Sequence, residues 1–153
     1  MDDATDDRPS AGRFAGTEHR LPLRVYYEDT DAGGVVYHAN YLRFMERGRS
    51  NMLTLLGTDQ RAARDAGVGQ YVVAEVQLRF LKPGMLHDEL VVVSQLVKLG
   101  GASSVIQQRV MRGADVLAQA DVVVVFTSLD GRPKRQPAEW VETFQRMKGN
   151  RWS

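Results

Sequence analysis

Four long strand-like segments constrain the fold of this chain more than any other feature. They cover residues 70–81, 88–99, 102–111 and 116–129. In the first of them apolar residues occupy every second position from Val72 to Phe80, a period that is typical of strands that bury one face. Short turns containing glycine connect them at Lys82-Pro83-Gly84, Gly100-Gly101 and Gly113-Ala114-Asp115. Because turns of this length favour hairpins, the sequence predicts an antiparallel sheet.

One long amphipathic helix is predicted ahead of these strands, over residues 40–56. Its main apolar stripe consists of Tyr41, Phe44, Met45, Gly48, Met52, Leu55 and Leu56. These residues recur at spacings of three and four, as on one face of a helix. Asn40 is a candidate N-cap, and Gly57 stands where a C-terminal cap is expected. A second, adjoining strip is formed by Leu42, Glu46, Arg49 and Leu53.

The remaining elements complete an order of strand, long helix, four strands and short helix. We expect a first strand from Leu21, a helical turn within 58–67 and a closing helix at 137–147. Residues 122–126 are apolar on both faces, which places their strand near the middle of the sheet. An antiparallel sheet of about five strands wrapped around the long helix satisfies this order, because sheet and helix can bury each other. The predicted class is α+β.

The two ends of the chain are predicted to lie outside the folded domain. Residues 1–20 contain four aspartates, two glycines, Pro9 and Ser10, and such composition buries too little apolar surface to offset the ordering entropy. We therefore expect a disordered tail over 1–20, one domain over 21–148 and a short tail over 149–153. His19 falls in the first tail, where we expect no catalytic role.

Composition excludes several classes of function. The formal net charge is +1 without a long basic block, which argues against a nucleic-acid binder. The chain has no cysteine, so a thiolate nucleophile is impossible and a reducing compartment is compatible. The N-terminus lacks the features of a signal peptide, and no apolar run is long enough to span a membrane. We expect a cytoplasmic protein without an integral membrane segment.

Chemistry is concentrated in residues 26–41, which enter the long helix. This loop holds three acids, Glu28, Asp29 and Asp31, two glycines and a histidine, His38. Apolar neighbours can exclude water and change the reactivity of a carboxylate. These residues alone do not choose among the three acids. A metal site is not favoured, because Asp29, Asp31 and His38 have no further His or Cys cluster beside them.

The run from Arg24 to Arg49 closely resembles the signature of hotdog-fold acyl-CoA thioesterases of the 4-hydroxybenzoyl-CoA thioesterase family. Within that family it is most similar to the YbgC-like branch, which is associated with the Tol-Pal system. The resemblance covers about Leu23 to Phe144, including residues 80–84, 99–103 and 130–134. It implies the hotdog fold and hydrolysis of acyl-CoA to a free acid and CoA. The family needs no metal or other cofactor.

The resemblance assigns the catalytic carboxylate to Asp31, acting as nucleophile or as general base for water. It also places an oxyanion donor at the backbone N–H near His38. The helix start supports this role, since it offers free N–H groups and the positive end of the macrodipole. The His38 imidazole can orient water or protonate the leaving thiolate, or it can serve the loop structure alone. The alternative for Asp31 is an Asx turn.

Other polar residues are expected in supporting roles. Tyr37 is a candidate for support beside His38. Glu46 is a second candidate acid, since some hotdog thioesterases carry their essential acid on this helix, but an ion pair with Arg49 or Arg43 is the alternative. Glu28 and Asp29 are expected to organise the loop or to stay solvated.

The densest basic cluster of the expected domain is a candidate site for the phosphates of CoA. It consists of Arg132, Lys134 and Arg135, whose side chains can make charge-assisted contacts. A solvated turn is the alternative. The hydroxybenzoyl relatives carry a more basic run near residues 99–103, where this chain has Gly100 and Gly101.

Assembly is expected because one hotdog unit leaves a sheet edge open. We predict a homodimer or a homotetramer built as a dimer of dimers, with the site between subunits. The substrate is expected to be acyl-CoA, and acyl carrier protein is a possible partner. A binding module for acyl-CoA or acyl carrier protein, with weak or incidental hydrolysis, is the alternative function.

Overall fold

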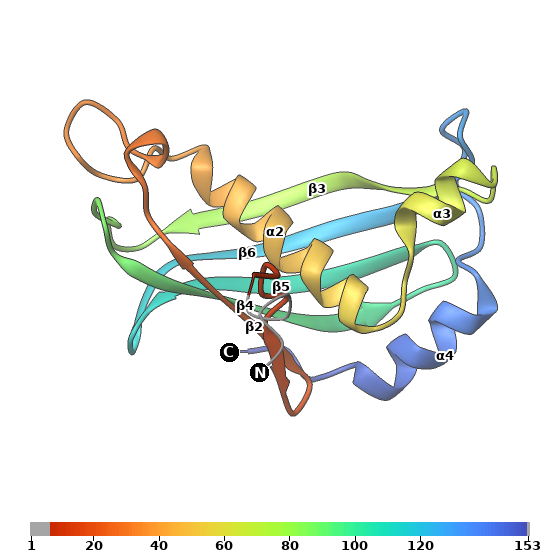
Figure 1. The fold of residues 1–153 in the computed structure, drawn as a ribbon. Helices are drawn as coiled ribbons and strands as arrows, with labels where there is room; N and C mark the ends of the chain where they lie inside the picture. The colour runs from red at the N-terminus through yellow and green to blue at the C-terminus, as the bar shows by residue number, and fades with distance from the viewer. Residues whose placement is uncertain (1–6, 153) are drawn as a thin grey trace.

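The computed structural model describes residues 7–152 and confirms the predicted order of elements (Figure 1). The strands are β1 (Arg13–Ala15), β2 (Glu18–Arg24), β3 (Gln70–Phe80), β4 (Glu89–Leu99), β5 (Ser103–Arg112) and β6 (Asp115–Thr127). The helices are η1 (Tyr27–Asp29), α2 (Asn40–Leu55), α3 (Gln60–Asp65) and α4 (Ala138–Met147). The four long strands and α2 agree with the sequence prediction to within two residues.

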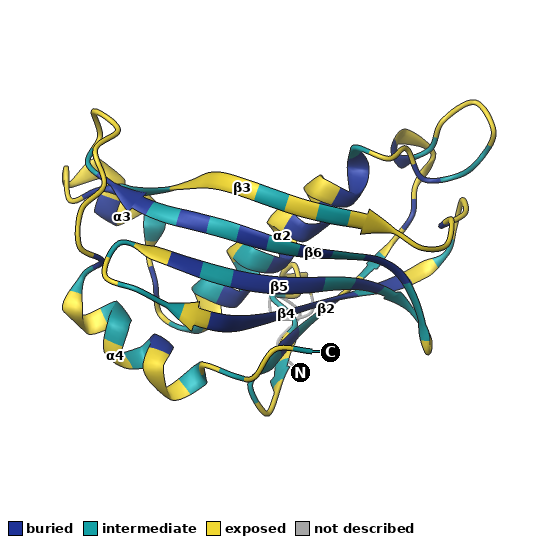
Figure 2. Ribbon diagram, turned by 180° about the vertical axis from the view of Figure 1, so that it is seen from behind, coloured by how far each residue is buried: buried dark blue, intermediate teal, exposed yellow. Residues whose placement is uncertain are grey.

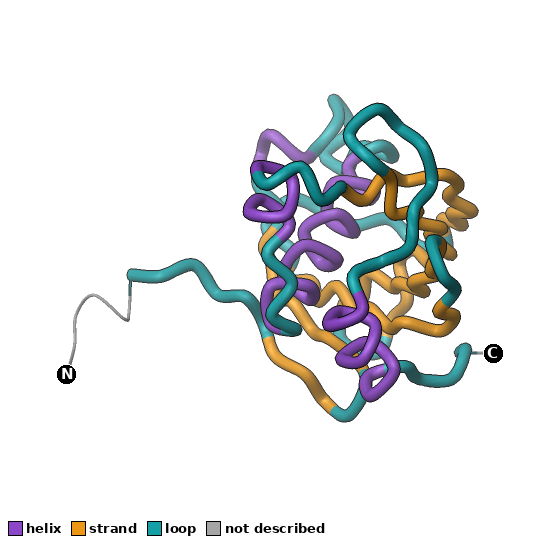
Figure 3. The backbone as a smooth tube through the Cα atoms, turned by 90° about the vertical axis from the view of Figure 1, so that its right-hand side faces the viewer, coloured by secondary structure: helices purple, strands orange, loops and turns teal. Residues whose placement is uncertain are grey.

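The strands form one antiparallel sheet in the order β1-β2-β4-β5-β6-β3. It has six strands, one more than expected, because the N-terminal segment contributes β1 as well as β2. A view along α2 shows the sheet curving around this helix (Figure 3). The main core lies between them, because the apolar stripe of α2 and the inner face of the sheet bury each other.

Close packing positions α2 on the sheet. Gly48 lies so near β4 that an added Cβ would stand 2.7 Å from Val92 Cγ1 and 2.9 Å from Ser94 Oγ. Beneath the helix the buried Gln108 amide donates hydrogen bonds to Met45 O and Ser94 Oγ, both 2.8 Å. A side chain larger than hydrogen at position 48 would therefore require the helix or these side chains to shift.

The ends of α2 agree only in part with prediction. Gly57 has a φ of 79°, and the N–H of Thr58 bonds the carbonyl of Leu53, so the helix closes with a Schellman motif. Asn40 is the first helical residue and not the N-cap, because its side chain is bound to a buried acid, while Ala39 takes the cap position. Leu55, expected in the buried stripe, is 45% exposed.

Residues 13–20, which we expected to be disordered, form β1 and the start of β2. His19 is fully buried, its Nε2 lies 2.7 Å from the carbonyl of Ala11, and its ring packs edge-on against Phe14. Local composition does not predict this segment, because its partners are strand β4, Ala11 and Phe14 and not the neighbours of each residue in sequence. Residues 1–6 of the expected tail lie outside the described part of the chain.

The expected C-terminal tail also has defined contacts. Gly149 donates to the carbonyl of Leu96, and the backbone N–H of Trp152 donates to Gln107. The Trp152 indole donates to Glu18 at 2.7 Å, and Arg109 lies 4.6 Å from the centre of its ring. Residues 149–152 therefore dock on the sheet face opposite α2, where backbone and side-chain partners hold them.

Exposure differs sharply across the sheet (Figure 2). Strand β6 lies between β5 and β3, so residues 122–126 are interior, although Val123 and Val125 stay partly exposed on the outer face. Strand β3 forms one edge of the sheet, and most of its residues are exposed, including Val72, Val73 and Phe80. This edge is long and apolar, a combination that natural proteins seldom leave uncovered.

Candidate active site

The acid-rich loop, residues 26–41, folds as a small hairpin that precedes α2. Thr30 and Val36 form an antiparallel bridge, and the Asp31 N–H donates to Val35 O at 2.9 Å. Asp31 stands at the exposed tip of this hairpin. Its Oδ1 accepts the N–H of Gly33 at 2.9 Å, which is an Asx turn. The turn uses one carboxylate oxygen, and Oδ2 has no hydrogen-bond partner among residues 7–152.

Asp29 has the opposite environment and holds the loop in place. Only 2% exposed, its carboxylate accepts hydrogen bonds from Asn40 Nδ2 at 2.7 Å and from the backbone N–H of Tyr26 at 2.8 Å. Its carbonyl accepts the N–H of Tyr37 at 2.9 Å. The expected organising role of Asp29 is thus seen in its contacts, whereas the alternative of a solvated side chain is wrong. Glu28 is exposed.

A second loop, residues 81–88, supports the first. The N–H of Val36 donates to Gly84 O at 2.8 Å, and the N–H of Gly84 donates to the hydroxyl of Tyr41 at 3.0 Å. Burial raises the pKa of Tyr41 above its usual value, so the phenol stays neutral. Sequence reasoning missed this contact, because Tyr41 and Gly84 are 43 positions apart.

An ion pair fixes the far side of this second loop. Arg112 Nη1 lies 2.8 Å from Asp88 Oδ2 and also donates to Pro83 O. Partial burial opposes ionisation of Asp88, but its bonds with Arg112 and with the Met85 N–H outweigh that effect and lower its pKa. The Arg112–Asp88 ion pair therefore persists at neutral pH and anchors the loop that carries Gly84.

Two backbone amides at the entrance of α2 are free to bind a ligand. Neither the His38 N–H nor the Ala39 N–H has an acceptor among the described residues, as is usual for the first turn of a helix. The His38 ring is exposed, 4.4 Å from the Tyr37 ring and 6.4 Å from that of Phe80, measured between centroids. Tyr37 is 46% exposed, so both aromatic side chains stand at the surface beside these amides.

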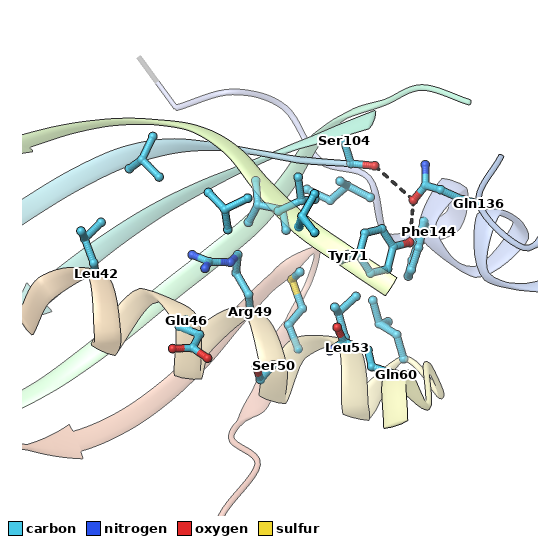
Figure 4. Close-up of a pocket in the computed structure, with 18 of the residues that line it drawn as sticks. Leu42, Glu46, Arg49, Ser50, Leu53, Gln60, Tyr71, Ser104, Gln136 and Phe144 are labelled. Atoms are coloured by element: carbon cyan, nitrogen blue, oxygen red, sulfur yellow. Dashed lines mark hydrogen bonds between the residues drawn. The ribbon is translucent and has the colours of Figure 1, made fainter. Parts of the chain in front are cut away.

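A cavity of about 450 Å³ lies between α2 and the sheet. Its lining is mostly Leu, Val, Met and Ile. The four residues of the second strip of α2, Leu42, Glu46, Arg49 and Leu53, all line it (Figure 4). Tyr71 stands at one end and donates to Gln136 at 2.6 Å. Burial raises the Tyr71 pKa strongly. Such a cavity suits an apolar group with a few polar atoms.

Glu46 lines this cavity without the ion pair that sequence reasoning offered as its alternative. No Arg or Lys nitrogen of the described residues lies within 4.0 Å of its carboxylate. Arg49 instead donates to Gln108 Oε1 at 2.9 Å. The sequence offers one indication of this contact, since Gln108 stands on the apolar face of a strand. It does not identify the partner, because Arg49 is 59 positions away.

The basic cluster lies at the other end of the sheet from the acid-rich loop. Arg132 is 3.6 Å from Asp130, with 86% of its side chain exposed, and Lys134 Nζ donates to Val68 O. Gln70 pairs with Thr127 at this end, whereas Phe80, next to His38, pairs with Ala118 at the other. Ten residues of strand span about 33 Å. Within one protomer the two groups therefore do not meet.

Among residues 7–152, no three His, Asp or Glu side chains gather in a way that would hold a metal ion. None of the described helices is long and apolar enough to cross a membrane.

Comparisons with known proteins agree with this architecture. Residues 25–147 match the family model of the thioesterase-like superfamily. The acyl-CoA thioesterase YbgC of Haemophilus influenzae is 38% identical over 129 residues, which are 84% of this chain and 95% of that protein. The acyl-CoA thioester hydrolase YbgC of Escherichia coli O6:H1 is 38% identical over 131 residues, 84% of this chain and 97% of its own.

Solved structures give the same result. A probable thioesterase from Bartonella henselae superimposes with a TM-score of 0.74 at 33% identity, covering 78% of this chain and 99% of that one. The hotdog architecture predicted from sequence is thereby confirmed. The family model, matched over residues 25–147, spans α2, the four long strands and the acid-rich loop. This chain belongs to the thioesterase-like superfamily and, within it, to the relatives of the YbgC acyl-CoA thioesterases.

Proposed function

We propose that this protein hydrolyses acyl-CoA thioesters to a carboxylic acid and CoA, with Asp31 as the catalytic carboxylate. One observation carries the proposal: a carboxylate with a free oxygen stands on a hairpin docked at a helix start whose first amides are unoccupied. Those amides, of His38 and Ala39, would receive the oxyanion that develops on the thioester carbonyl. Family membership supports the reaction class.

Two routes use the same residues. In the first, Asp31 Oδ2 bonds the carbonyl carbon, the C–S bond breaks, and water then hydrolyses the mixed anhydride. In the second, Asp31 takes a proton from water, whose oxygen attacks the same carbon. In both, the CoA thiolate leaves and is protonated. The exposed His38 imidazole is a donor for that proton in our proposal, and Tyr37 limits its rotation through ring contact.

The two parts of the substrate, the acyl group and CoA, would bind in different regions of the protein. The apolar cavity along α2 suits the acyl group, and Glu46 contributes polarity there without taking over catalysis. The basic cluster of Arg132, Lys134 and Arg135 suits the phosphates of CoA. No cofactor or metal enters the proposed reaction.

A homodimer would bring these regions together. Pairing two β3 edges antiparallel sets the Phe80 end of one strand against the Gln70 end of the other. The partner subunit's acid-rich loop would then stand beside the basic cluster, about 33 Å from its position in the same protomer. We propose such a dimer as the active unit, with a tetramer as a dimer of dimers. A cytoplasmic location and an association with the Tol-Pal system stay predictions.

Replacing Asp31 by Asn tests the catalytic assignment. Removal of the ionised oxygen should reduce kcat by at least about a hundredfold, in the range of general acid or base effects. Glu28→Gln is the matched control, since it removes one exposed acid from the same loop, and it should keep near wild-type kcat. Circular dichroism checks that both variants fold. Wild-type turnover by folded Asp31→Asn would refute the assignment.

The second candidate function is a binding module for acyl-CoA or acyl carrier protein. The Asx turn favours it, because that turn alone accounts for an aspartate at position 31. A panel of short, long and aromatic acyl-CoAs separates the two functions. A module would show slow hydrolysis of every member, unchanged in Asp31→Asn, whereas the enzyme should turn over at least one member rapidly.

A further inference from the structure

Arg49 is the feature of the cavity that an apolar acyl group does not explain. Its side chain extends from α2 toward the strands, while the Glu46 carboxylate stays beside the helix (Figure 4). Arg49 is a partly buried residue, and the cavity that it lines is mostly apolar. A cation in such surroundings is costly unless an acceptor or an anion meets it.

The protein itself satisfies only a small part of this guanidinium. An arginine offers five N–H donors, and Arg49 uses one of them, to Gln108. No carboxylate of the described residues lies within 4.0 Å of it. Burial lowers the pKa of Arg49, and the negative charge of Glu46 opposes this shift only from a greater distance. Among the described residues, Arg49 therefore has no carboxylate in direct contact, and Glu46 acts on it only through longer-range attraction.

The position of Arg49 is nevertheless fixed. Gln108 is fully buried, and both polar atoms of its side-chain amide make hydrogen bonds. Its Nε2 donates to Met45 O and Ser94 Oγ, and its Oε1 accepts from Arg49. The side chain is therefore held with its remaining donors free. A held planar fork of N–H groups matches the two oxygens of a carboxylate.

We propose that Arg49 selects acyl groups that carry a carboxylate on the chain, so that the preferred substrates are CoA monothioesters of dicarboxylic acids. This inference rests on the proposed function, because it assigns the acyl chain to the cavity along α2. The chain methylenes contact the Leu and Val lining, and the distal carboxylate forms with Arg49 the direct ion pair that no carboxylate of the described residues provides.

Three pairs of thioesters test this assignment: butanoyl with succinyl, hexanoyl with adipoyl, and octanoyl with suberoyl CoA. Members of a pair differ only in a terminal methyl or carboxylate. We expect the wild type to favour the carboxylate, by kcat/KM, at one length or more. Arg49→Gln should reduce that preference about tenfold, as expected for loss of a charge-assisted bond. Arg49→Lys, which keeps the charge without the fork, should retain part of it.

Arg47→Gln is the matched control. It removes the same charge from the same helix, but Arg47 is exposed beside Phe44 and does not line the cavity. The Arg47→Gln variant should prefer the carboxylate member of each pair as strongly as the wild type does. A wild-type preference for the methyl member at every length would overturn the inference, as would equal preferences in Arg49→Gln and Arg47→Gln.

Binding to the Asp31→Asn protein separates this inference from the proposed hydrolysis. Calorimetric titration should show tighter binding of the dicarboxylic thioester, and adding Arg49→Gln should remove the difference. If the wild type hydrolyses no thioester while this binding preference holds, the hydrolytic function fails and the selection by Arg49 stands. If hydrolysis proceeds without any carboxylate preference, the selection fails alone.

Discussion

Asp29 and Asp31 show how two acids two residues apart receive different tasks from their surroundings. Asp29 is buried and bound by Asn40 and Tyr26, so its oxygens are committed to the loop. Asp31 is exposed at the hairpin tip, and one of its carboxylate oxygens has no hydrogen-bond partner in the described part of the chain. A reacting carboxylate needs an uncommitted oxygen, and only Asp31 of these two has one. The side chain that shapes the loop and the one proposed to react are therefore separate.

His19 should make stability depend on pH. Burial lowers its pKa, with the bond to Ala11 opposing, so the folded protein holds a neutral ring where the unfolded chain takes up a proton. The contribution of His19 to stability is then fully present above its ordinary pKa of 6.5 and is lost as the pH falls through that value toward the lower folded pKa. The melting temperature should be lower at pH 5.5 than at pH 7.5.

His19→Gln removes this titration and should flatten the dependence over that interval. His38→Gln is the matched control, since His38 is exposed, and it should keep the wild-type slope. Thermal unfolding followed by circular dichroism at both pH values measures each slope. An equal slope in the wild type and His19→Gln would show that another group senses the pH.

At the scale of elements, the close packing of α2 against the sheet depends on Gly48. Gly48→Ala gains up to about 1 kcal/mol of helix propensity. It also pushes a methyl group against Val92 and Ser94, and overpacking of this kind costs about 1–3 kcal/mol. We expect a net loss in the free energy of unfolding by urea denaturation. Ser50→Ala, at an exposed position of the same helix, should change this free energy by less than about 0.5 kcal/mol.

The elements also show which parts of the structure could be read from the sequence. Strands β3 to β6 and α2 were predicted closely, because periods of two and of 3.6 are local signals. The β1–β2 hairpin was missed, since the burial of His19 depends on Ala11 and Phe14 and not on its own neighbours' composition.

The same limit applies to the candidate site. The loop with Asp31 and the cavity strip with Arg49 follow from local patterns. The contact of Arg49 with Gln108 joins residues 59 positions apart, and that of Tyr41 with Gly84 joins residues 43 apart. Such pairings are set by strand register, which no local pattern specifies.

At the scale of the whole molecule, the open β3 edge predicts a dimer. Val73 lies on this edge and is 49% exposed. Val73→Lys would place a charge at the proposed interface, where edge lysines oppose strand pairing. The variant should sediment as a folded monomer with reduced activity, while the wild type sediments as a dimer or tetramer. Val68→Lys, a similar change outside the strand, should assemble normally. An active wild-type monomer would contradict the shared site.

The contact between Glu18 and the Trp152 indole links the first and last parts of the described chain across the outer face of the sheet. Gln95 joins the same assembly, since it bonds Thr17 and the carbonyl of Asn150. Detaching either segment removes partners from the other, so the free energy of local opening is shared. The two segments should therefore open together as one cooperative unit. A substitution that removes a contact in either segment should lower the free energy of opening of both.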